Sequence, residues 1–331
     1  MAVFVLFQPK GIAGSTFLTL DHLTQEGWST LVISNAPLSE ADRTRLAAAS
    51  GHVIERPNTG YDFGAYREGW RWLHRRGLAL DRLILMNDST WFPLRMNDTS
   101  LKRMEALNAD LAGQIYKTEK TEAKGRDHLE SHLLMLSGRA LSHPAIQRFW
   151  AAYVMTKYKP RTILFGEKGL SQAAMTANLS VAGLLGREQM VDLLSNLSDA
   201  DLLEALDHLA LHNEPARLQR TAWKGAASVG QPWRESFLAW TSQELSNSRQ
   251  HLVSATYVAS ASRYGDMGFL KKSNERRFHL ARLAFLRGIE EGYLSSINTT
   301  VMLEVQASTS SWKPQEHWRL DPDEQMRPVG L

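Results

Sequence analysis

The chain has 331 residues and nearly balanced charge, with 38 Lys and Arg against 35 Asp and Glu and a formal net charge of +3. Its hydrophobic content of 43% suffices for a sizeable core and predicts one or two folded domains. The absence of cysteine excludes a disulfide framework, thiolate metal sites and a cysteine nucleophile.

The first residues predict a buried strand rather than a targeting segment. The start of the chain lacks the basic residues, the long apolar stretch and the small-residue cleavage site of a signal peptide. No uninterrupted apolar run approaches the roughly 20 residues that a membrane-spanning helix needs. We therefore expect a cytoplasmic protein, with any membrane contact being peripheral.

Short apolar runs alternate with stretches of helical period over the first half of the chain. The runs predicted as strands are residues 3–7, 30–34, 52–56, 82–86 and 132–137. The stretches predicted as helices are residues 16–25, 39–49, 65–76 and 140–157. Strands that alternate with helices predict an α/β fold, with a mostly parallel sheet flanked by helices on both faces.

Helical periodicity dominates after residue 166, so we expect the sheet to end before residue 170. Further helices are predicted at 169–177, 187–211, 234–262 and 274–294, and a loop rich in Gly and Pro at 223–232. A boundary near residue 215 divides the chain into an α/β domain, 1–215, and a mainly helical C-terminal region, 216–331. The stretch 308–331 is expected to be a frayed tail.

The first polar motif precedes the helix predicted at 65–76. Asn58 and Asp62 flank Gly60, and Gly64 follows. Glycines let the backbone turn sharply and approach a ligand closely, while a helix N-terminus favours anionic groups such as a diphosphate. In isolation the same segment is more typical of a turn, with Asp62 as a helix cap.

The second motif, Asn87-Asp88-Ser89, directly follows the strand predicted at 82–86. Open α/β sheets bind their ligands at the carboxyl ends of strands. A carboxylate there suits a magnesium or manganese ion that contacts a diphosphate, so Asp88 is the candidate metal ligand. An Asx-turn that closes the strand is an equally good interpretation of this motif alone.

The third motif is the stretch from Asp127 to His132. On a strand, His128, Glu130 and His132 would point to one face and could form a metal site or a wall of an acceptor site. The His-x-Glu pattern occurs in zinc deaminases, but the cysteines that those sites require are absent. A hydrogen-bonded polar strand end is the more frequent outcome for such a pattern.

The fourth motif places Glu167 after Gly166, at the start of the helix predicted from residue 169. If this carboxylate faces the same cleft as Asp88, it could act as a general base that deprotonates an acceptor hydroxyl. The structural alternative is a first-turn glutamate that the helix dipole stabilises.

Together these motifs resemble the rhamnan synthesis protein F family over roughly residues 1–215. The resemblance is carried by Asn58-x-Gly60-Tyr61-Asp62-Phe63-Gly64, Asn87-Asp88-Ser89 with Pro93-Leu94, the stretch from His128 to Leu136, Phe149-Trp150 and Glu167-x-Gly169-Leu170-Ser171. It implies a GT-A-like fold and a glycosyltransferase of cell-surface polysaccharide biosynthesis. The implied donor is dTDP-rhamnose.

Carried over residue by residue, the resemblance implies that Asn58 and Asp62 contact the nucleotide, that Asp88 replaces a metal-binding Asp-x-Asp motif, and that Glu167 lies at the acceptor side. We expect the neighbours of the nucleotide-binding residues to take part in donor binding: Gly60, Tyr61, Asn87 and Ser89. The residues expected to contact the glycan acceptor are His128, Glu130 and Ser131. Since Asn87-Asp88 offers one carboxylate only, the need for a divalent cation stays open.

Two alternatives and one membrane hypothesis accompany this interpretation. The chain could use another nucleotide sugar, or it could be a non-catalytic scaffold that binds nucleotide sugars. Residues 271–294 combine an apolar helical stripe with six basic residues, which suits either a helix on anionic lipid or a helix packed on the core. Nucleic acid is not an expected partner, because no recognised binding module surrounds this charge.

Overall fold

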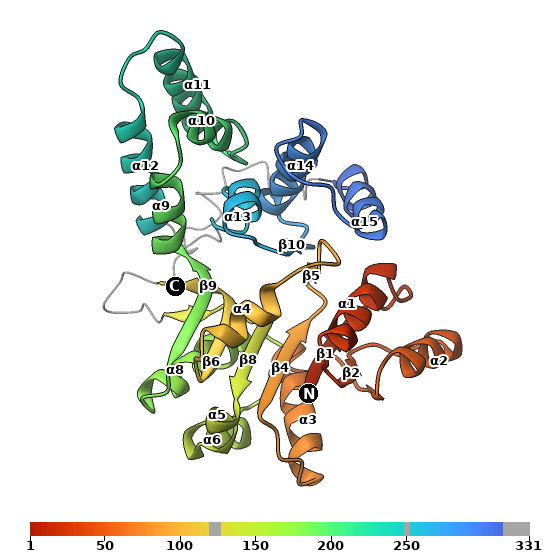
Figure 1. Cartoon of the computed structure of the whole chain (residues 1–331). Coiled ribbons are helices and arrows are strands. Elements are labelled where there is room, and N and C mark those ends of the chain that lie inside the picture. The colour runs from red at the N-terminus through yellow and green to blue at the C-terminus, as the bar shows by residue number, and fades with distance from the viewer. Residues whose placement is uncertain (119–126, 248–251, 314–331) are drawn as a thin grey trace.

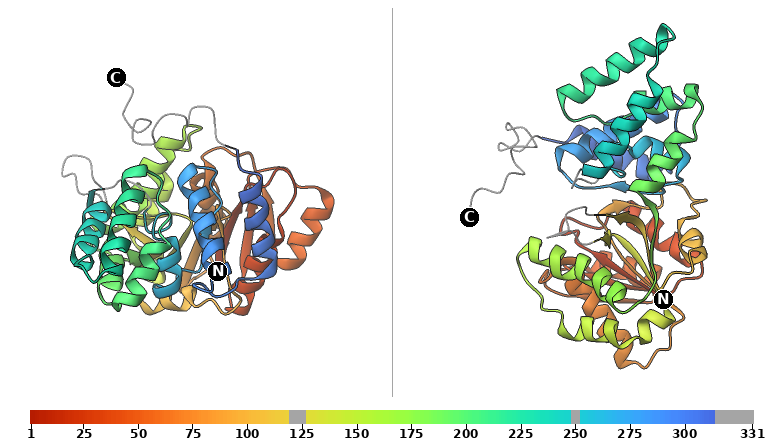
Figure 2. Two further views of the ribbon diagram at one scale, coloured as in Figure 1. Left: turned by 90° about the horizontal axis from the view of Figure 1, so that it is seen from above. Right: turned by 90° about the vertical axis from the view of Figure 1, so that its left-hand side faces the viewer.

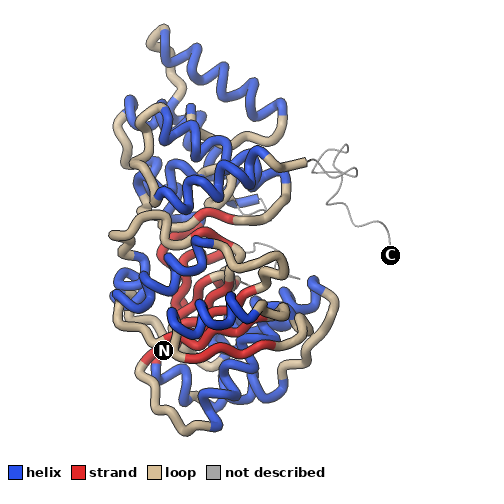
Figure 3. The backbone as a smooth tube through the Cα atoms, turned by 90° about the vertical axis from the view of Figure 1, so that its right-hand side faces the viewer, coloured by secondary structure: helices blue, strands red, loops and turns tan. Residues whose placement is uncertain are grey.

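The computed structural model describes residues 1–118, 127–247 and 252–313 (Figure 1). Within this part of the chain, a sheet with helices on both faces lies at one end of the molecule, and a group of helices lies at the other (Figure 2, Figure 3). The two ends share one buried core cluster, since it contains both Phe4 of the sheet and Phe285 of a C-terminal helix.

The sheet has the strand order β3-β2-β1-β4-β8-β6-β7, and β9 pairs with β6 beside this path. Its strands are β1 (Ala2–Leu6), β2 (Thr30–Ser34), β3 (His52–Glu55), β4 (Arg82–Asn87), β6 (Leu111–Lys117), β7 (His128–Leu129), β8 (Leu133–Ser137) and β9 (Val181–Gly186). Within the described sheet, β7 and β8 run opposite to the other strands. Because β2 and β4 lie on opposite sides of β1, the carboxyl ends of β1 and β4 border the crevice where such sheets bind ligands.

Alternate residues of each strand enter the two layers of the core. In β1, Val3 and Val5 belong to one buried cluster, while Phe4 and Leu6 belong to the other. The helices over the first face are α3 (Tyr61–Arg75), α5 (Gly138–Ser142), α6 (Pro144–Ala152) and α8 (Lys168–Thr176). Those over the second face are α1 (Gly14–Gln25), α2 (Glu40–Ala49) and α4 (Ser100–Ala106). This sandwich fixes the ends of β1, β4 and α3 relative to one another.

The helical end of the molecule follows β9 directly (Figure 1). Its elements are α9 (Arg187–Ser195), α10 (Asp199–Asp207), α11 (Glu214–Ser228), α12 (Arg234–Asn247), α13 (Val258–Tyr264), α14 (Arg276–Glu290) and α15 (Thr299–Ser310). α15 packs on α1, and the short strand β10 (Leu270–Lys271) pairs antiparallel with β5 (Thr90–Trp91). Both contacts bring C-terminal residues close to the carboxyl ends of β1 and β4.

The predicted α/β fold is confirmed, with a mostly parallel sheet, flanking helices and further helices at the C-terminal end. All five predicted strands are present within one or two residues of their expected bounds. The division into domains at residue 215 stays a prediction. The tail predicted from residue 308 begins inside α15, and its residues 314–331 lie outside the described part of the chain.

Several predictions of local structure were wrong. The single helices predicted at 187–211 and 234–262 are α9 with α10, and α12 with α13. The sheet does not end before residue 170, because β9 adds a parallel strand beside β6; glycines interrupt the apolar pattern of both strands. The helix predicted at 140–157 is broken at His143, whose side chain caps a new helix that starts at Pro144. The loop predicted at 223–232 begins only after Ser228, since Trp223 is buried within α11.

Candidate active site

The end of β4 is tied to the end of β1 through Asp88. Its Oδ2 atom accepts hydrogen bonds of 2.9 Å from the backbone N–H of Phe7 and from Nε2 of Gln8. Ser89 closes a turn in the same segment, because its N–H and hydroxyl both donate to Oδ1 of Asn87. The predicted Asx-turn is therefore present, and it places Asp88 at the carboxyl ends of β1 and β4, the edge of the sheet where such folds bind ligands.

Glycines shape the loop from Asn58 to the start of α3. Gly60 has φ of 82°, a left-handed conformation that glycine adopts without strain. Gly64 lies against the same loop, since a Cβ atom there would lie 2.2 Å from the carbonyl oxygen of Thr59. The α3 helix therefore begins directly at the loop, with Asp62 in its first turn. Asn58 is half-buried in this loop and makes no hydrogen bond to Asp62 or Asp88 among the described contacts.

Asp62 and Glu167 meet at Ser131, and we call these three residues the carboxyl cluster. Oε2 of Glu167 accepts hydrogen bonds from the N–H of Ser131 at 2.9 Å and from its hydroxyl at 2.6 Å. The same hydroxyl lies 3.4 Å from Oδ2 of Asp62. Asn87 donates its side-chain amide to that Oδ2 atom at 3.0 Å, which links the cluster to the residue beside Asp88.

The carboxyl cluster and Asp88 act on one another electrostatically. Burial, and secondly the charge of Glu167, raises the pKa of Asp62 to about 6. Burial also raises the pKa of Tyr66 well above its usual value, and the charges of Asp62, Glu167 and Asp88 add to this rise. Hydrogen bonds therefore bring Asp62 to Glu167 through Ser131 and to the segment of Asp88 through Asn87, whereas a single pocket shared by the three carboxylates stays a prediction.

Glu167 does not lie at a helix start, contrary to the sequence-based prediction. It ends the π-helical turn η1 (Ile163–Glu167), which continues α7 (Lys159–Thr162) into α8 without a break. Such turns within α-helices are frequent at functional sites. Gly166 permits this placement, because a Cβ atom there would lie 2.5 Å from the ring of Phe63. The helix therefore packs tightly on α3 and directs Glu167 toward Ser131.

The stretch 128–132 divides between two environments. His128 and Ser131 border Glu167, with Nε2 of His128 3.6 Å from its Oε1 atom, whereas the buried side chains of Glu130 and His132 face Lys271. Lys271 of β10 approaches Glu130 at 3.0 Å and Nδ1 of His132 at 3.1 Å. Within residues 1–118, 127–247 and 252–313, no group of three or more His, Asp or Glu could hold a metal ion by itself. A polar strand end describes Glu130, which pairs with Lys271, whereas His128 lies beside Glu167; the predicted contact of both residues with an acceptor stays a prediction.

A second group of polar residues, which the sequence motifs did not predict, borders Asp88. We call Ser15, Lys272 and Glu304 the lysine cluster. Nζ of Lys272 donates to Oγ of Ser15 at 3.2 Å, and Ser15 donates its N–H and hydroxyl to Glu304 at 2.8 and 2.6 Å. The indole N–H of Trp91 also donates to Glu304, at 2.9 Å.

Lys272 is held close to the motif at 87–89. Its backbone N–H donates to the carbonyl oxygen of Ser89 at 2.8 Å, which continues the pairing of β10 with β5. Burial lowers the pKa of Lys272, while the charges of Asp88 and Glu304 oppose this change. The only sequence signal was the pair Lys271-Lys272, which belongs to the basic stretch 271–294 that suited either anionic lipid or packing on the core.

Residues 271–294 do not present all of that basic charge to solvent. Lys271 faces Glu130 and His132, and Lys272 belongs to the lysine cluster. Arg282 is fully buried and donates to the carbonyl oxygens of Lys271 and Ser273. The predicted apolar stripe is buried at Phe278, Ala281 and Phe285. The structure therefore supports core packing for this stripe, and lipid contact through 271–294 remains an untested proposal.

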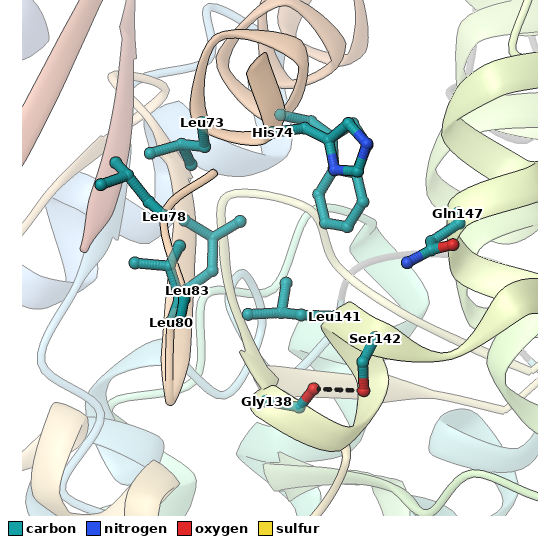
Figure 4. Close-up of a pocket in the computed structure, with 11 residues that line it drawn as sticks. Leu73, His74, Leu78, Leu80, Leu83, Gly138, Leu141, Ser142 and Gln147 are labelled. Carbon is teal, nitrogen blue, oxygen red and sulfur yellow. Dashed lines mark hydrogen bonds between the residues drawn. The ribbon is translucent and has the colours of Figure 1, made fainter. Parts of the chain in front are cut away.

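An apolar cavity of about 300 Å³ lies at the other end of α3 and β4 (Figure 4). Leu73, Leu80, Leu83 and Leu141 line it, and the side chains of His74 and Gln147 border it. No residue of the carboxyl or lysine cluster contributes to its wall. Across the described residues, the helices are also too short or too polar to cross a membrane.

Residues 30–178 match the model of the family described as rhamnan synthesis protein F, which confirms the resemblance for that segment. The protein y4gN of Sinorhizobium fredii (strain NBRC 101917 / NGR234), described as uncharacterized, is 28% identical over 309 residues, covering 92% of this chain and 78% of that protein. A solved structure of a candidate nucleotide-diphospho-sugar transferase from Desulfovibrio desulfuricans G20 is 14% identical, covering 56% of this chain and 79% of that chain with a TM-score of 0.28. The matched segment contains the whole carboxyl cluster and Asp88, but none of the lysine cluster.

Proposed function

We propose that this chain is a glycosyltransferase, which moves a sugar from a nucleotide sugar to a hydroxyl of a glycan acceptor. The observation that carries the proposal is the meeting of Asp62, Ser131 and Glu167 beside Asp88, at the carboxyl ends of β1 and β4. These residues all lie in the segment that matches the rhamnan synthesis protein F family. A carboxylate that can accept a proton, close to a second one that can contact the leaving group, suits the transfer of a sugar to a hydroxyl.

We assign the diphosphate of the donor to the neighbourhood of Asp88 and Lys272. The ammonium group of Lys272 supplies positive charge there, and Ser15 fixes its position. The first amides of α3 are less suited to this role, because the N–H of Phe63 already donates to Asp62 at 3.0 Å. We keep Asp62 as a contact of the nucleotide sugar, through the lone pair of Oδ1 that Phe63 leaves unused.

The carboxylate of Asp88 suits a divalent cation that is also bound by phosphate oxygens of the substrate. Phe7 and Gln8 donate hydrogen bonds to Oδ2 of Asp88 and not to Oδ1. We therefore assign Oδ1 as the atom that would bind the cation. Magnesium is commonly bound by one or two carboxylates together with substrate phosphates. When bound, such an ion stabilises the charge that develops on the leaving diphosphate. Asp88 would hold it, and Lys272 contributes to the same stabilisation whether or not the ion is present.

In the proposed reaction, Glu167 acts as the general base. It takes the proton of the acceptor hydroxyl while the acceptor oxygen forms a bond to the anomeric carbon of the donor. The bond from that carbon to the diphosphate oxygen breaks in the same step, and the electron pair leaves with the nucleoside diphosphate. One displacement inverts the anomeric centre, so a β-L-linked rhamnose donor gives an α-L-rhamnoside. Ser131 orients Glu167 through its two hydrogen bonds.

We further propose dTDP-rhamnose as the donor and a glycan or lipid-linked glycan as the acceptor, in a cytoplasmic protein that can contact the membrane peripherally. The name of the matching family supports rhamnose. A thermal-shift panel of nucleotides and nucleotide sugars, with and without manganese, tests the donor, because a ligand that binds only the folded state raises the melting temperature. Transfer from dTDP-rhamnose to a rhamnosyl acceptor is then measured by product formation.

The outcomes separate the proposal from its alternatives. A shift with dTDP-rhamnose and product formation supports a rhamnosyltransferase. A larger shift and product with another nucleotide sugar replaces the donor and keeps the enzyme class. Binding without turnover, over a range of acceptors, favours the non-catalytic scaffold. No shift with any nucleotide contradicts the proposed function.

A further inference from the structure

The segment from Val154 to Phe165 exposes an unusual concentration of apolar side chains. Val154, Tyr158 and Phe165 are 79%, 62% and 55% exposed, and Ile163 and Leu164 are also exposed. Single exposed apolar residues are ordinary on protein surfaces, but a contiguous group of them marks an interaction site. We call residues 154–165 the exposed segment.

The helical turn of the exposed segment shows its apolar side to solvent. Thr162 and Gly166 are buried and attach the turn to the protein, with Gly166 against the ring of Phe63. The three residues between them, Ile163 to Phe165, therefore project away from the protein. A helix of a globular protein normally buries its apolar face. The reversed orientation indicates that another apolar phase covers this turn.

Basic residues accompany these apolar side chains. Lys157, Lys159 and Arg161 are exposed within the exposed segment, and the sequence from Tyr153 to Gly166 contains no Asp or Glu. Apolar side chains interleaved with Lys and Arg are typical of a surface that enters the interface of an anionic bilayer. An acidic protein partner would satisfy the charge, but it would not require three adjacent apolar residues on one outward turn.

The exposed segment is joined to the candidate active site. The carbonyl oxygen of Thr156 accepts a hydrogen bond from Gly60 at 3.0 Å, and that of Lys157 accepts one from the hydroxyl of Tyr61 at 2.8 Å. At its other end, Glu167 follows Phe165 by two residues. A membrane that binds this segment would therefore lie next to Glu167, the residue proposed to activate the acceptor.

We propose that the exposed segment binds the surface of an anionic membrane and thereby brings a lipid-linked acceptor to Glu167. The second part of this proposal rests on the proposed function, whereas membrane binding by itself does not. The apolar side chains enter the boundary between headgroups and acyl chains, and the basic residues contact lipid phosphates. This surface replaces residues 271–294 as the lipid-binding element, because much of the charge on that segment is turned inward.

Flotation of the full chain with vesicles tests membrane binding. Wild type is expected to float with vesicles of phosphatidylglycerol and phosphatidylcholine, and much less with phosphatidylcholine alone. The triple variant Val154→Ser/Leu164→Ser/Phe165→Ser is expected to bind more than tenfold more weakly. The charge variant Lys159→Gln/Arg161→Gln should bind roughly 25-fold more weakly, since each basic residue near such a surface contributes about fivefold.

A matched control removes equally exposed apolar residues elsewhere. Leu107→Ser/Leu218→Ser/Val229→Ser should float as wild type does, because these residues lie on other elements. The proposal is overturned if wild type does not float, or if the Val154, Leu164 and Phe165 variant floats as well as the control. It is also overturned if Arg276→Gln/Arg277→Gln abolishes flotation while the exposed-segment variant retains it.

The proposed function is measured separately in the same proteins. The exposed-segment variant should keep the thermal shift given by dTDP-rhamnose and should lose transfer to a membrane-embedded acceptor only. If dTDP-rhamnose gives no shift in wild type while flotation depends on the exposed segment, the proposed function fails and membrane binding stands. If transfer to a membrane-embedded acceptor is unchanged in the variant, delivery of the acceptor by this segment is contradicted.

Discussion

The carboxyl cluster and the lysine cluster lie at the same edge of the sheet, but they differ in how their charges are balanced. In the carboxyl cluster, two carboxylates are joined by the hydroxyl of Ser131. In the lysine cluster, the ammonium of Lys272 lies near the two carboxylates of Asp88 and Glu304. Like charges raise the proton affinity of a carboxylate, whereas a neighbouring cation supplies charge that can stabilise an anion.

This difference assigns separate tasks to the two clusters. In the carboxyl cluster, Ser131 holds Glu167 in place to accept a proton, beside Asp62, whose pKa burial and the charge of Glu167 raise to about 6. A lysine that is fixed by Ser15 and partly desolvated suits the stabilisation of a leaving diphosphate, because reduced screening strengthens its charge. The crevice therefore separates proton transfer from leaving-group stabilisation.

Replacing Glu167 by Gln breaks the carboxyl cluster and should have the largest effect. The amide keeps the shape of the side chain but cannot take a proton, so we expect turnover to fall by roughly 10²- to 10⁴-fold. Donor binding, measured by calorimetry, should change little. The control is Glu188→Gln, which alters an exposed glutamate on α9 and should leave turnover unchanged. Near-normal turnover of Glu167→Gln would show that another group accepts the proton.

Replacing Lys272 by Met removes the cation of the lysine cluster. We expect affinity for a nucleoside diphosphate to fall roughly 10- to 100-fold, the range for losing a hydrogen bond to a charged group. The loss should be smaller with manganese present, because the ion restores positive charge beside Asp88. The measurement is a calorimetric titration with and without manganese.

The control for Lys272 makes the same charge change far from the site. Lys102→Met removes an exposed lysine whose partner is Glu26, and affinity should stay as in wild type. Equal affinity of Lys272→Met and Lys102→Met would remove Lys272 from the donor site. A melting temperature for each variant distinguishes loss of binding from loss of folding.

The carboxyl cluster was accessible from the sequence because its members belong to short local motifs. Asp62, like Asp88 beside the cluster, follows a strand, and the common direction of parallel strands places such ends at one edge of the sheet. The lysine cluster was not accessible, since Ser15, Lys272 and Glu304 meet only after α15 packs on α1 and β10 pairs with β5. β5 and β10 have two residues each, which is too short for a strand to show a periodic pattern in the sequence.

The fold shows the same limit. Strands β1 to β4 are apolar runs between turn residues, and they were predicted with nearly correct bounds. β6 and β9 both contain glycines, and β6 also contains polar residues, so their pairing depends on the sheet that already exists. Glu167 was expected at a helix start because glycine often precedes one, but Gly166 serves close packing on Phe63 instead.

Replacing Asp62 by Asn should stabilise the protein in a pH-dependent way. The pKa of Asp62 is raised from 3.8 to about 6 in the folded state, so ionisation costs about 3 kcal/mol above pH 6. Asn removes that cost and loses roughly one hydrogen bond, worth about 1 kcal/mol. We expect the free energy of unfolding at pH 7.5 to rise by about 2 kcal/mol, and the gain to vanish below pH 4, where the carboxyl is protonated in both states. Urea unfolding at the two pH values measures this, and a gain that persists at pH 4 would contradict the electrostatic explanation.

Replacing Glu304 by Gln removes one negative charge from the lysine cluster, and we expect it to have the smallest effect on binding. The amide oxygen can still accept one hydrogen bond from Ser15, but the amide nitrogen cannot accept those from the Ser15 hydroxyl and Trp91, so stability should fall by about 1 kcal/mol. Lys272 would lose one of its two anionic neighbours, so affinity for a nucleoside diphosphate should rise roughly two- to fivefold. Calorimetric titration beside Lys272→Met tests this. A fall in affinity would mean that Glu304 acts chiefly by holding Ser15 and Lys272 in place, and that its charge does not compete with the diphosphate for the ammonium.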